Sequence, residues 1–340
     1  MGCEVWVPGR STTGDGGAND EDWERARSVS VDEPAAWGRA HRDELEALLR
    51  EHGALLFRGF GLHSVARFEA FVTAISDDAP TFEEESSPRR QVSETVYTST
   101  DHPAAQPIQF HCEYSYSARW PMKLFFGCML PASEGGETPI SDTRRVLARL
   151  RPDLVDAFRR RKVLYARRFS PEMGVPWQRA FRTEDPAQVE RFCRSAAIEV
   201  TWTQDGALRT RQVGDAIVRH PITSDELWFN HAFFFNVHAI EPVEVRAALL
   251  ESVAEDSLST HTYFGDGEPI PIDVIEEIRA AYRAAAIGFH WRRGDALLID
   301  NMRMAHSRTP YAGSRKVVVA MTESFERPRT PRLLGEAASG

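Results

Sequence analysis

Residues 294–321 read GDALLIDNMRMAHSRTPYAGSRKVVVAM, and this stretch carries the clearest fold signal in the sequence. Its two apolar runs, DALLIDNMRMAHSR at 295–308 and KVVVAMTESF at 316–325, predict two β-strands, because dense apolar and β-branched residues favour buried strands. A Pro- and Gly-containing turn separates the runs and predicts that the strands are antiparallel neighbours. His306 lies on or at the end of the first strand, and Arg315 opens the second.

Similar patterns extend upstream through most of the chain. Further strands are predicted at 54–60, 108–117, 122–130, 163–169, 198–202 and 208–213. Apolar residues at helical spacing predict helices at 35–53, 64–76, 143–161, 186–196, 243–255 and 272–286. The strands do not alternate regularly with helices, so a doubly wound parallel sheet is disfavoured. The pattern instead predicts a mainly β fold with flanking helices (α+β), built on a sandwich or barrel core.

Composition divides the chain into unequal parts. Residues 1–30 are rich in Gly, Asp, Ser and Thr, which predicts a flexible N-terminal arm. Residues 31–327 are expected to form a single domain, and residues 328–340 a C-terminal tail. Residues 78–106 are polar and Pro-rich, and a loop of this length in a compact domain is often a functional lid.

The charge balance excludes some classes of function. The net charge is −9, so no basic excess is available to neutralise nucleic-acid phosphates. No apolar run approaches the roughly 18 residues that a membrane span needs, and the N-terminus lacks the apolar centre of a signal peptide. The expected location is therefore the cytoplasm. The cysteines form no CxxC pair, which favours reduced thiols over a zinc knuckle or a disulfide framework.

A His-x-acid pattern, which can supply two metal ligands, occurs twice. In a strand, side chains at i and i+2 point to the same face, whereas in a helix they diverge by about 200°. His41 and Asp43 lie in a predicted helix and are interpreted as a solvated helix face. His111 and Glu113 lie in the alternating segment IQFHCEYSYS and can bind one ion. Two histidines and one carboxylate on one face of an iron ion leave positions open for a chelating co-substrate and oxygen.

His306 is the candidate for the second histidine, on a strand far along the chain. A dicarboxylate such as 2-oxoglutarate chelates iron through its first carboxylate and its ketone, which leaves its far carboxylate to be held by the protein. Arginine suits this role because its planar fork can bind a carboxylate with two hydrogen bonds. Arg315 is the preferred residue, since it enters a strand expected to run antiparallel to that of His306. Arg308, two residues beyond His306, is the alternative.

Taken in order, these segments resemble the taurine dioxygenase/clavaminate synthase-like family of iron(II)- and 2-oxoglutarate-dependent oxygenases. The resemblance covers about residues 50–325. It rests on the order and spacing of GALLFRGF, HCEYSY, LFFGCMLPASEGGETPISD, WFNHAFFF, TYFGDGEPI and the closing segment quoted first.

This resemblance implies a double-stranded β-helix core of the jelly-roll, cupin-like type. It implies Fe(II) bound by His111, Glu113 and His306, with 2-oxoglutarate as co-substrate and O2 as oxidant. It also implies that Arg315 and Thr138 hold 2-oxoglutarate. Halogenating members replace the acidic ligand with a small residue, so Glu113 favours hydroxylation, with desaturation or cyclisation as alternatives. The subgroup that the chain resembles includes amino-acid hydroxylases of nonribosomal peptide pathways, which favours a free or carrier-tethered amino acid as substrate.

Substrate contacts are less well defined by the sequence. Gln109, Asn230, His231 and Arg308 are candidates, and each is also compatible with a structural role. The aromatic segment WFNHAFFFNVH is interpreted as core with satisfied histidines rather than as another metal site. Two other classes remain as alternatives: a zinc hydrolase with the same three ligands, and a non-catalytic binding protein on a cupin-like scaffold. A carboxylate anchor made by Thr138 and Arg315 argues against a hydrolase, which has no need of one.

Overall fold

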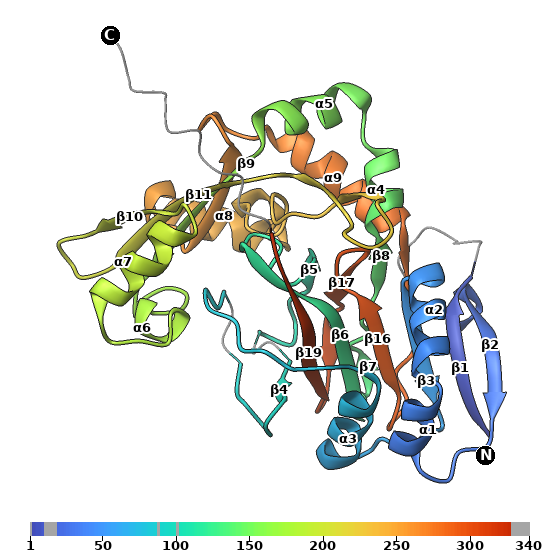
Figure 1. The fold of residues 1–340 in the computed structure, drawn as a ribbon. Coiled ribbons are helices and arrows are strands. Elements are labelled where there is room, and N and C mark those ends of the chain that lie inside the picture. Colours follow the sequence, from blue (N-terminus) through green and yellow to red (C-terminus); the bar gives the residue numbers. More distant parts are fainter. Residues whose placement is uncertain (1, 10–18, 87–88, 100–101, 328–340) are drawn as a thin grey trace.

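The computed structural model describes residues 2–9, 19–86, 89–99 and 102–327 (Figure 1). The strand pairings among these residues are antiparallel. The largest sheet has the spatial order β2 (Trp23–Val29), β1 (Cys3–Pro8), β3 (Ala54–Arg58), β16 (Ala296–Asp300), β6 (Arg119–Leu130), β19 (Lys316–Glu326) and β4 (Val96–Thr98). The second sheet has the order β15 (Ala286–Ile287), β8 (Ile140–Asp142), β17 (Met304–Arg308) and β5 (Ile108–His111).

A third sheet lies to one side of these two (Figure 1). Its order is β10 (Glu199–Trp202), β11 (Leu208–Gly214), β9 (Val163–Phe169) and β14 (Thr260–Phe264). Two short pairs complete the described strands: β12 (Ile217–Arg219) with β13 (Glu226–Trp228), and β18 (Tyr311–Ala312) with β7 (Glu134–Gly135).

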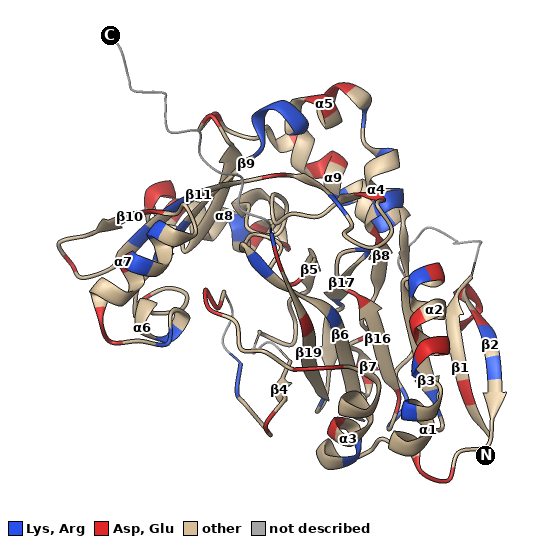
Figure 2. Cartoon of the chain, in the orientation of Figure 1, with Lys and Arg blue, Asp and Glu red and all other residues tan. Residues whose placement is uncertain are grey.

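Helices flank the sheets. They are α1 (Pro34–Ala40), α2 (Arg42–His52), α3 (Val65–Ile75), α4 (Thr143–Arg149), α5 (Pro152–Arg161), α6 (Trp177–Ala180), α7 (Pro186–Ser195), α8 (Val243–Ser252) and α9 (Ile272–Ala284). Short 3-10 turns occur at Asp20–Asp22, Val237–Ala239 and Glu255–Ser257. Residues of both charge signs lie along α2, α5 and α7 (Figure 2). Among the helices of the described chain, none is long and apolar enough to cross a membrane.

Apolar residues that alternate along the central strands determine the layers. On β16, Leu297 and Ile299 belong to the core that includes the second sheet, whereas Leu298 belongs to a core on the opposite face. The same alternation runs along β19, where Val319 and Val318 face opposite cores. Helices α1, α2 and α3 supply the second core, so the largest sheet is covered on both faces. This arrangement confirms the predicted mainly β fold with flanking helices.

The prediction of a flexible arm at residues 1–30 was wrong for the part of this segment that the structure describes. Strand β1 pairs with both β2 and β3, which extends the largest sheet. The reason is the alternation of Cys3, Val5 and Val7, which are 5%, 0% and 4% exposed. Polar residues around these three positions concealed the strand in the composition. Part of the segment, residues 10–18, and the tail at 328–340 lie outside the described residues.

Two of the long predicted helices are interrupted. The helix expected at 35–53 is divided into α1 and α2 at His41, whose ring stacks on Trp37 and whose Nδ1 lies 2.8 Å from the carbonyl oxygen of Trp37. The helix expected at 143–161 is divided because Pro152 disfavours helical geometry in the residue before it and is instead well suited to begin α5.

Candidate metal centre

The register of two neighbouring strands brings two histidines together. His306 on β17 is the direct cross-strand partner of His111 on β5, and their ring centroids are 4.2 Å apart. Glu113 completes the group, in which one ligand atom from each residue lies within 4.8 Å of the others. The three residues are 5–6% exposed, so they form a buried cluster. It is the one group of this kind found in the part of the chain that the structure describes.

Glu113 reaches the cluster by a different route from the one predicted. Strand β5 ends at His111, and Glu113 lies in the turn that follows it, immediately before Tyr114 with its positive φ of 58°. The side chain of Asn301 fixes this turn: its Oδ1 accepts the backbone N–H of Glu113 at 2.7 Å, and its Nδ2 donates to the Glu113 carbonyl at 2.9 Å. The convergence of His111 and Glu113 therefore depends on a tertiary contact as well as on their spacing.

Asn301 is available for this contact because the strand predicted at 295–308 is interrupted. Strand β16 belongs to the largest sheet and β17 to the second sheet, and residues 301–303 form the turn between them. Asp300 holds this turn, since its Oδ1 accepts the N–H groups of Met302 and Arg303 at 3.0 and 3.1 Å. Asn301 is fully buried, and its Nδ2 also donates to the carbonyl of Pro121 at 2.8 Å.

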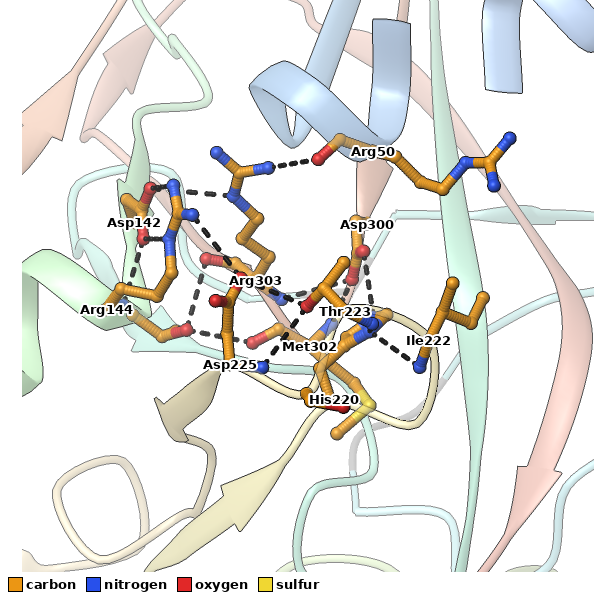
Figure 3. Close-up of polar contacts among 12 residues, drawn as sticks. Arg50, Asp142, Arg144, His220, Ile222, Thr223, Asp225, Asp300, Met302 and Arg303 are labelled. Carbon is orange, nitrogen blue, oxygen red and sulfur yellow. Dashed lines mark hydrogen bonds and ion pairs between the residues drawn. The ribbon is translucent and has the colours of Figure 1, made fainter. Parts of the chain in front are cut away.

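A polar network supports the turn from its other side (Figure 3). His220 Nε2 lies 3.0 Å from Asp300 Oδ2, while its Nδ1 accepts the backbone N–H groups of Ile222 and Thr223. Arg303 donates from Nη1 to the carbonyl of Arg50 at 2.6 Å, which ties the turn to the end of α2. Sequence patterns do not predict this network, because its members come from four distant segments.

The protonation of the two histidines suits metal binding. Burial lowers the pKa of His111, and burial lowers the pKa of His306 well below its usual value, so both rings are neutral near pH 7. His111 Nδ1 lies 2.9 Å from the carbonyl of Gln109, which makes Nδ1 the protonated nitrogen and leaves Nε2 free to bind a metal. His111 Nε2 lies 3.9 Å from Glu113 Oε2.

Arg315 and Thr138 lie together beside this cluster. Arg315 donates from Nη2 to Thr138 Oγ1 at 3.3 Å and from Nε to the carbonyl of Gly136 at 2.8 Å. A Cβ at Gly136, where φ is +72°, would lie 2.9 Å from Arg315 Cδ, so glycine makes room for the arginine. The expected pairing of the two last strands was wrong, since β19 pairs with β6 and β4 rather than with β17. Arg315 therefore approaches the site from the opposite sheet.

Arg308, the alternative to Arg315, uses its guanidinium to hold backbone. It donates to the carbonyls of His102, Pro103 and Gln106 at 3.0, 2.6 and 2.5 Å. These contacts fix the segment that leads into β5. A register shift on β17 between His306 and Arg308 accompanies this arrangement.

The other candidate substrate residues have different surroundings. Gln109 donates its amide to Glu241 at 2.9 Å, in a cavity that does not include His111. Both ends of the Asn230 amide bind backbone, at the Ala216 carbonyl and the Ala232 N–H. His231 lies next to the cluster, with its ring centroid 5.9 Å from that of His111 and its Nδ1 2.6 Å from Ser115 Oγ.

A cavity of about 440 Å³, including its open mouth, lies beside the histidines. Its lining includes His111, His306, Thr138, Arg308 and Arg315, together with apolar residues such as Phe126 and Val319. The space next to Arg315 is therefore open rather than filled by packed side chains.

The sequence patterns did not predict one charged residue of this cavity. Arg89, from the loop at 78–106, also lines the cavity and places Nη2 2.5 Å from Glu113 Oε2. The only local signal was a polar run, SSPRR, which does not distinguish a buried arginine from a solvated one.

The donor set fits ferrous iron. Two neutral imidazoles and one carboxylate, with an adjoining cavity for further ligands, are the ligands that non-haem Fe(II) oxygenases use. Within the described residues the buried Nδ1 of His306 has no hydrogen-bond partner, and a buried polar atom of this kind is one that a bound ion or water can satisfy. The fold and the site together define a non-haem iron oxygenase of the 2-oxoglutarate-dependent class.

Comparison with known proteins identifies the family. The model of the taurine catabolism dioxygenase TauD/TfdA family matches residues 15–322, and the chain belongs to this family. It is thus an Fe(II)- and 2-oxoglutarate-dependent dioxygenase. The dapdiamide synthesis protein DdaC of Enterobacter agglomerans is 39% identical over 279 residues, which cover 82% of this chain and 84% of that protein. A clavaminate synthase-like protein of Arabidopsis thaliana is 30% identical over 295 residues, covering 83% and 85%.

Solved structures agree with the fold. Asparagine oxygenase, in complex with Fe(II), 3-hydroxyasparagine and succinate, superposes with a TM-score of 0.51 at 16% identity, covering 85% of this chain and 81% of that one. The PvcB protein of Pseudomonas aeruginosa gives a TM-score of 0.50 at 16% identity, covering 86% and 84%. These similarities confirm the expected fold, the double-stranded β-helix of this family.

Proposed function

We propose that this enzyme hydroxylates a free or carrier-bound amino acid, or a similar small polar metabolite, in secondary metabolism. The observation that carries the proposal is the approach of His111, Glu113 and His306 to within 4.8 Å beside a cavity that reaches Arg315. The relationship to a dapdiamide synthesis protein, at 39% identity over most of both chains, supports secondary metabolism as the setting.

Each residue has a distinct task in this proposal. His111, Glu113 and His306 would hold Fe(II) beside the cavity. When bound, iron and 2-oxoglutarate would activate O2, the oxidant: one oxygen atom enters a C–H bond of the substrate and the other enters succinate, with carbon dioxide released as 2-oxoglutarate is oxidised. Thr138 Oγ1 accepts hydrogen bonds from Arg315 and from Trp291 Nε1 at 3.1 Å, so its own O–H remains to be donated. Arg315 and Thr138 then bind the far carboxylate of 2-oxoglutarate.

The surroundings of these groups favour an oxidation that must be protected from water. Phe126 packs 5.1 Å from the ring of His306, and Phe234 stacks at 4.3 Å on the ring of His111. Apolar walls of this kind limit water beside the metal and reduce side reactions. The carboxylate of Glu113 occupies the position that halogenating relatives keep small, which supports hydroxylation.

The proposal is tested by anaerobic addition of Fe(II) and 2-oxoglutarate, with a weak visible charge-transfer band as the readout. The wild type gives the band, and His111→Ala and His306→Ala do not, because each variant lacks an imidazole ligand. Succinate release in air is then screened against amino acids and carrier-bound aminoacyl groups. A zinc hydrolase or a non-catalytic binding protein gives no band, and that result with metal-loaded wild type contradicts the proposed function.

A further inference from the structure

Arg89 places a second guanidinium in the cavity of the metal site. Its Nη2 lies 2.5 Å from Glu113 Oε2, and its Nη1 lies 3.5 Å from the sulfur of Met321. The side chain is only 11% exposed. A thioether is a weak acceptor, so the described contacts leave most of the five N–H donors of Arg89 without a strong acceptor.

The backbone of Arg89 is held on both sides, which gives the side chain a defined position. Its N–H donates to Glu85 Oε1 at 3.0 Å, and its carbonyl accepts from Arg179 Nη2 at 2.9 Å. Arg179 in turn approaches Glu85 at 3.5 Å. These contacts with Arg179 on α6 therefore hold the loop in place, so that Arg89 faces the cavity.

The cavity as a whole is cationic. Its lining contains three arginines (Arg89, Arg308 and Arg315), and none of its described lining residues is Asp or Glu. Three backbone carbonyls hold Arg308, and Arg315 faces the far end of 2-oxoglutarate in the proposed function. Glu113 is the one described carboxylate bound to the side chain of Arg89, and it is also a proposed metal ligand. A carboxylate that binds a divalent cation has less charge to offer to Arg89, and Glu85, the other nearby carboxylate, binds the backbone N–H of Arg89 rather than its guanidinium.

We propose that Arg89 binds a carboxylate of the substrate, which makes the enzyme specific for anionic, amino-acid-like molecules. This inference deepens the proposed function and rests on it. The guanidinium fork can accept a carboxylate with two hydrogen bonds, and the partly dry cavity strengthens such a contact. Arg89 thereby anchors the substrate at the side of the cavity formed by the loop at 78–106. Arg315, immediately before β19, anchors 2-oxoglutarate.

The test compares Arg89→Met with the matched variant Arg90→Met. Arg90 is the exposed neighbour on the same loop, and its described hydrogen bonds involve only its backbone. The probes are the proteinogenic L-amino acids and their N-acetyl derivatives, each as free carboxylate and as primary amide. Binding is measured as the thermal shift of protein loaded with Mn(II) and 2-oxoglutarate, and turnover as succinate release from the Fe(II) enzyme.

The expected result is a change in the preference for carboxylate over amide. The wild type and Arg90→Met favour the carboxylate form of the accepted probes by at least about 30-fold, as expected for a partly buried charge pair. Arg89→Met loses this preference, and Arg89→Lys keeps part of it, since lysine retains the charge but not the fork. The affinity for 2-oxoglutarate, read from the anaerobic visible band, is the same in all of these proteins.

Other outcomes overturn the proposal. An unchanged carboxylate preference in Arg89→Met, or no carboxylate-dependent shift with any probe in the wild type, excludes Arg89 as the substrate anchor. Weaker Mn(II) binding with an unchanged preference makes it a positioning residue for Glu113 instead. Weaker 2-oxoglutarate binding in Arg89→Met assigns it to the co-substrate. These results leave the proposed function standing, whereas a wild type without the visible band removes both proposals together.

Discussion

Arg315 illustrates how much a single residue depends on its surroundings. Its described hydrogen bonds go to the neutral oxygens of Gly136 and Thr138, and burial lowers its pKa to about 10. The guanidinium therefore stays protonated at neutral pH, although it is poorly solvated. A buried cation of this kind gains most from an incoming carboxylate, because the ligand restores the charge interaction that water no longer provides.

Replacement of Arg315 by Met is expected to weaken 2-oxoglutarate binding by at least about 30-fold, since removing one member of a buried charge pair costs about 2–5 kcal/mol. The measurement is an anaerobic titration of the Fe(II) protein with 2-oxoglutarate. Lys316→Met is the matched control, because Lys316 is the exposed neighbouring cation. Equal affinities in the two variants would remove Arg315 from the co-substrate site.

At the scale of elements, the turn between β16 and β17 links the two sheets to the metal centre. Asn301 binds both backbone groups of Glu113, and Asp300 holds the turn on which Asn301 sits. Figure 3 shows Asp300 in contact with both His220 and the backbone N–H of Met302, within a larger polar network. The turn thus positions Glu113, one candidate metal ligand, and Asn301 lies five residues before His306, another.

Asn301→Ala is expected to lower the affinity for divalent metal by about 10- to 100-fold, the usual cost of losing a residue that supports a ligand. Asn236→Ala is the control, because Asn236 is also a buried asparagine whose amide binds Thr262 and the His238 N–H. Both variants lose stability, and only Asn301→Ala loses metal affinity. Mn(II) titration followed by electron paramagnetic resonance makes the comparison, and equal metal affinities would refute the positioning role.

The N-terminal strand is a second element whose contribution can be measured. Val5 on β1 is fully buried in the core shared with α2, α3 and β3. Val5→Ala is expected to destabilise the protein by about 2 kcal/mol, from two lost methyl groups and the space they leave. Arg25→Ala on β2 removes a surface ion pair with Glu4 and is expected to cost less than about 1 kcal/mol. Urea unfolding of the metal-free proteins measures the loss of stability in both variants. If Val5→Ala loses as little as Arg25→Ala, β1 contributes little to the stability of the protein.

On the scale of the whole molecule, several imidazoles are folded into places where they must stay neutral. Burial lowers the pKa of His261, which lies away from the candidate metal ligands; Glu255 has a smaller opposing effect, and His238 adds a smaller lowering. His261 Nδ1 accepts the backbone N–H of Val237 at 3.2 Å, a bond that requires this nitrogen to be unprotonated. Such groups stabilise the fold above the pKa of the unfolded state, which is about 6.5.

The stabilisation from His261 is expected to disappear as the pH falls from about 6.5 toward its folded pKa, because only the unfolded chain takes up the proton there. The free energy of unfolding of the wild type then falls more steeply with decreasing pH than that of His261→Asn, by up to about 1.4 kcal/mol per pH unit. Asparagine retains an acceptor near the Nδ1 position but does not titrate. Urea unfolding of metal-free proteins at several pH values between 5 and 7.5 tests this, and parallel slopes would contradict it.

Much of this architecture could be predicted from local pattern. The helix that ends at Gly53, the helix begun by Ser64 and the strands on either side of the turn at 309–314 follow from periodicity and from Gly and Pro. Strand β1 could not be predicted in the same way, because its alternation is short and lies among polar residues. Its burial depends on β3 and α2, which supply the apolar surface that it covers.

The sequence by itself determined the candidate ligands, the spacing of His111 and Glu113 and the family, since each depends on residue identity and local order. Only the tertiary structure decided that His306 lies opposite His111, that Asn301 turns Glu113 inward and that Arg89 joins the cavity. Those three contacts span 195, 188 and 24 residues along the chain. Local pattern carries no information on them, because the energy that fixes each contact comes from packing and hydrogen bonds between elements that meet only in the folded protein.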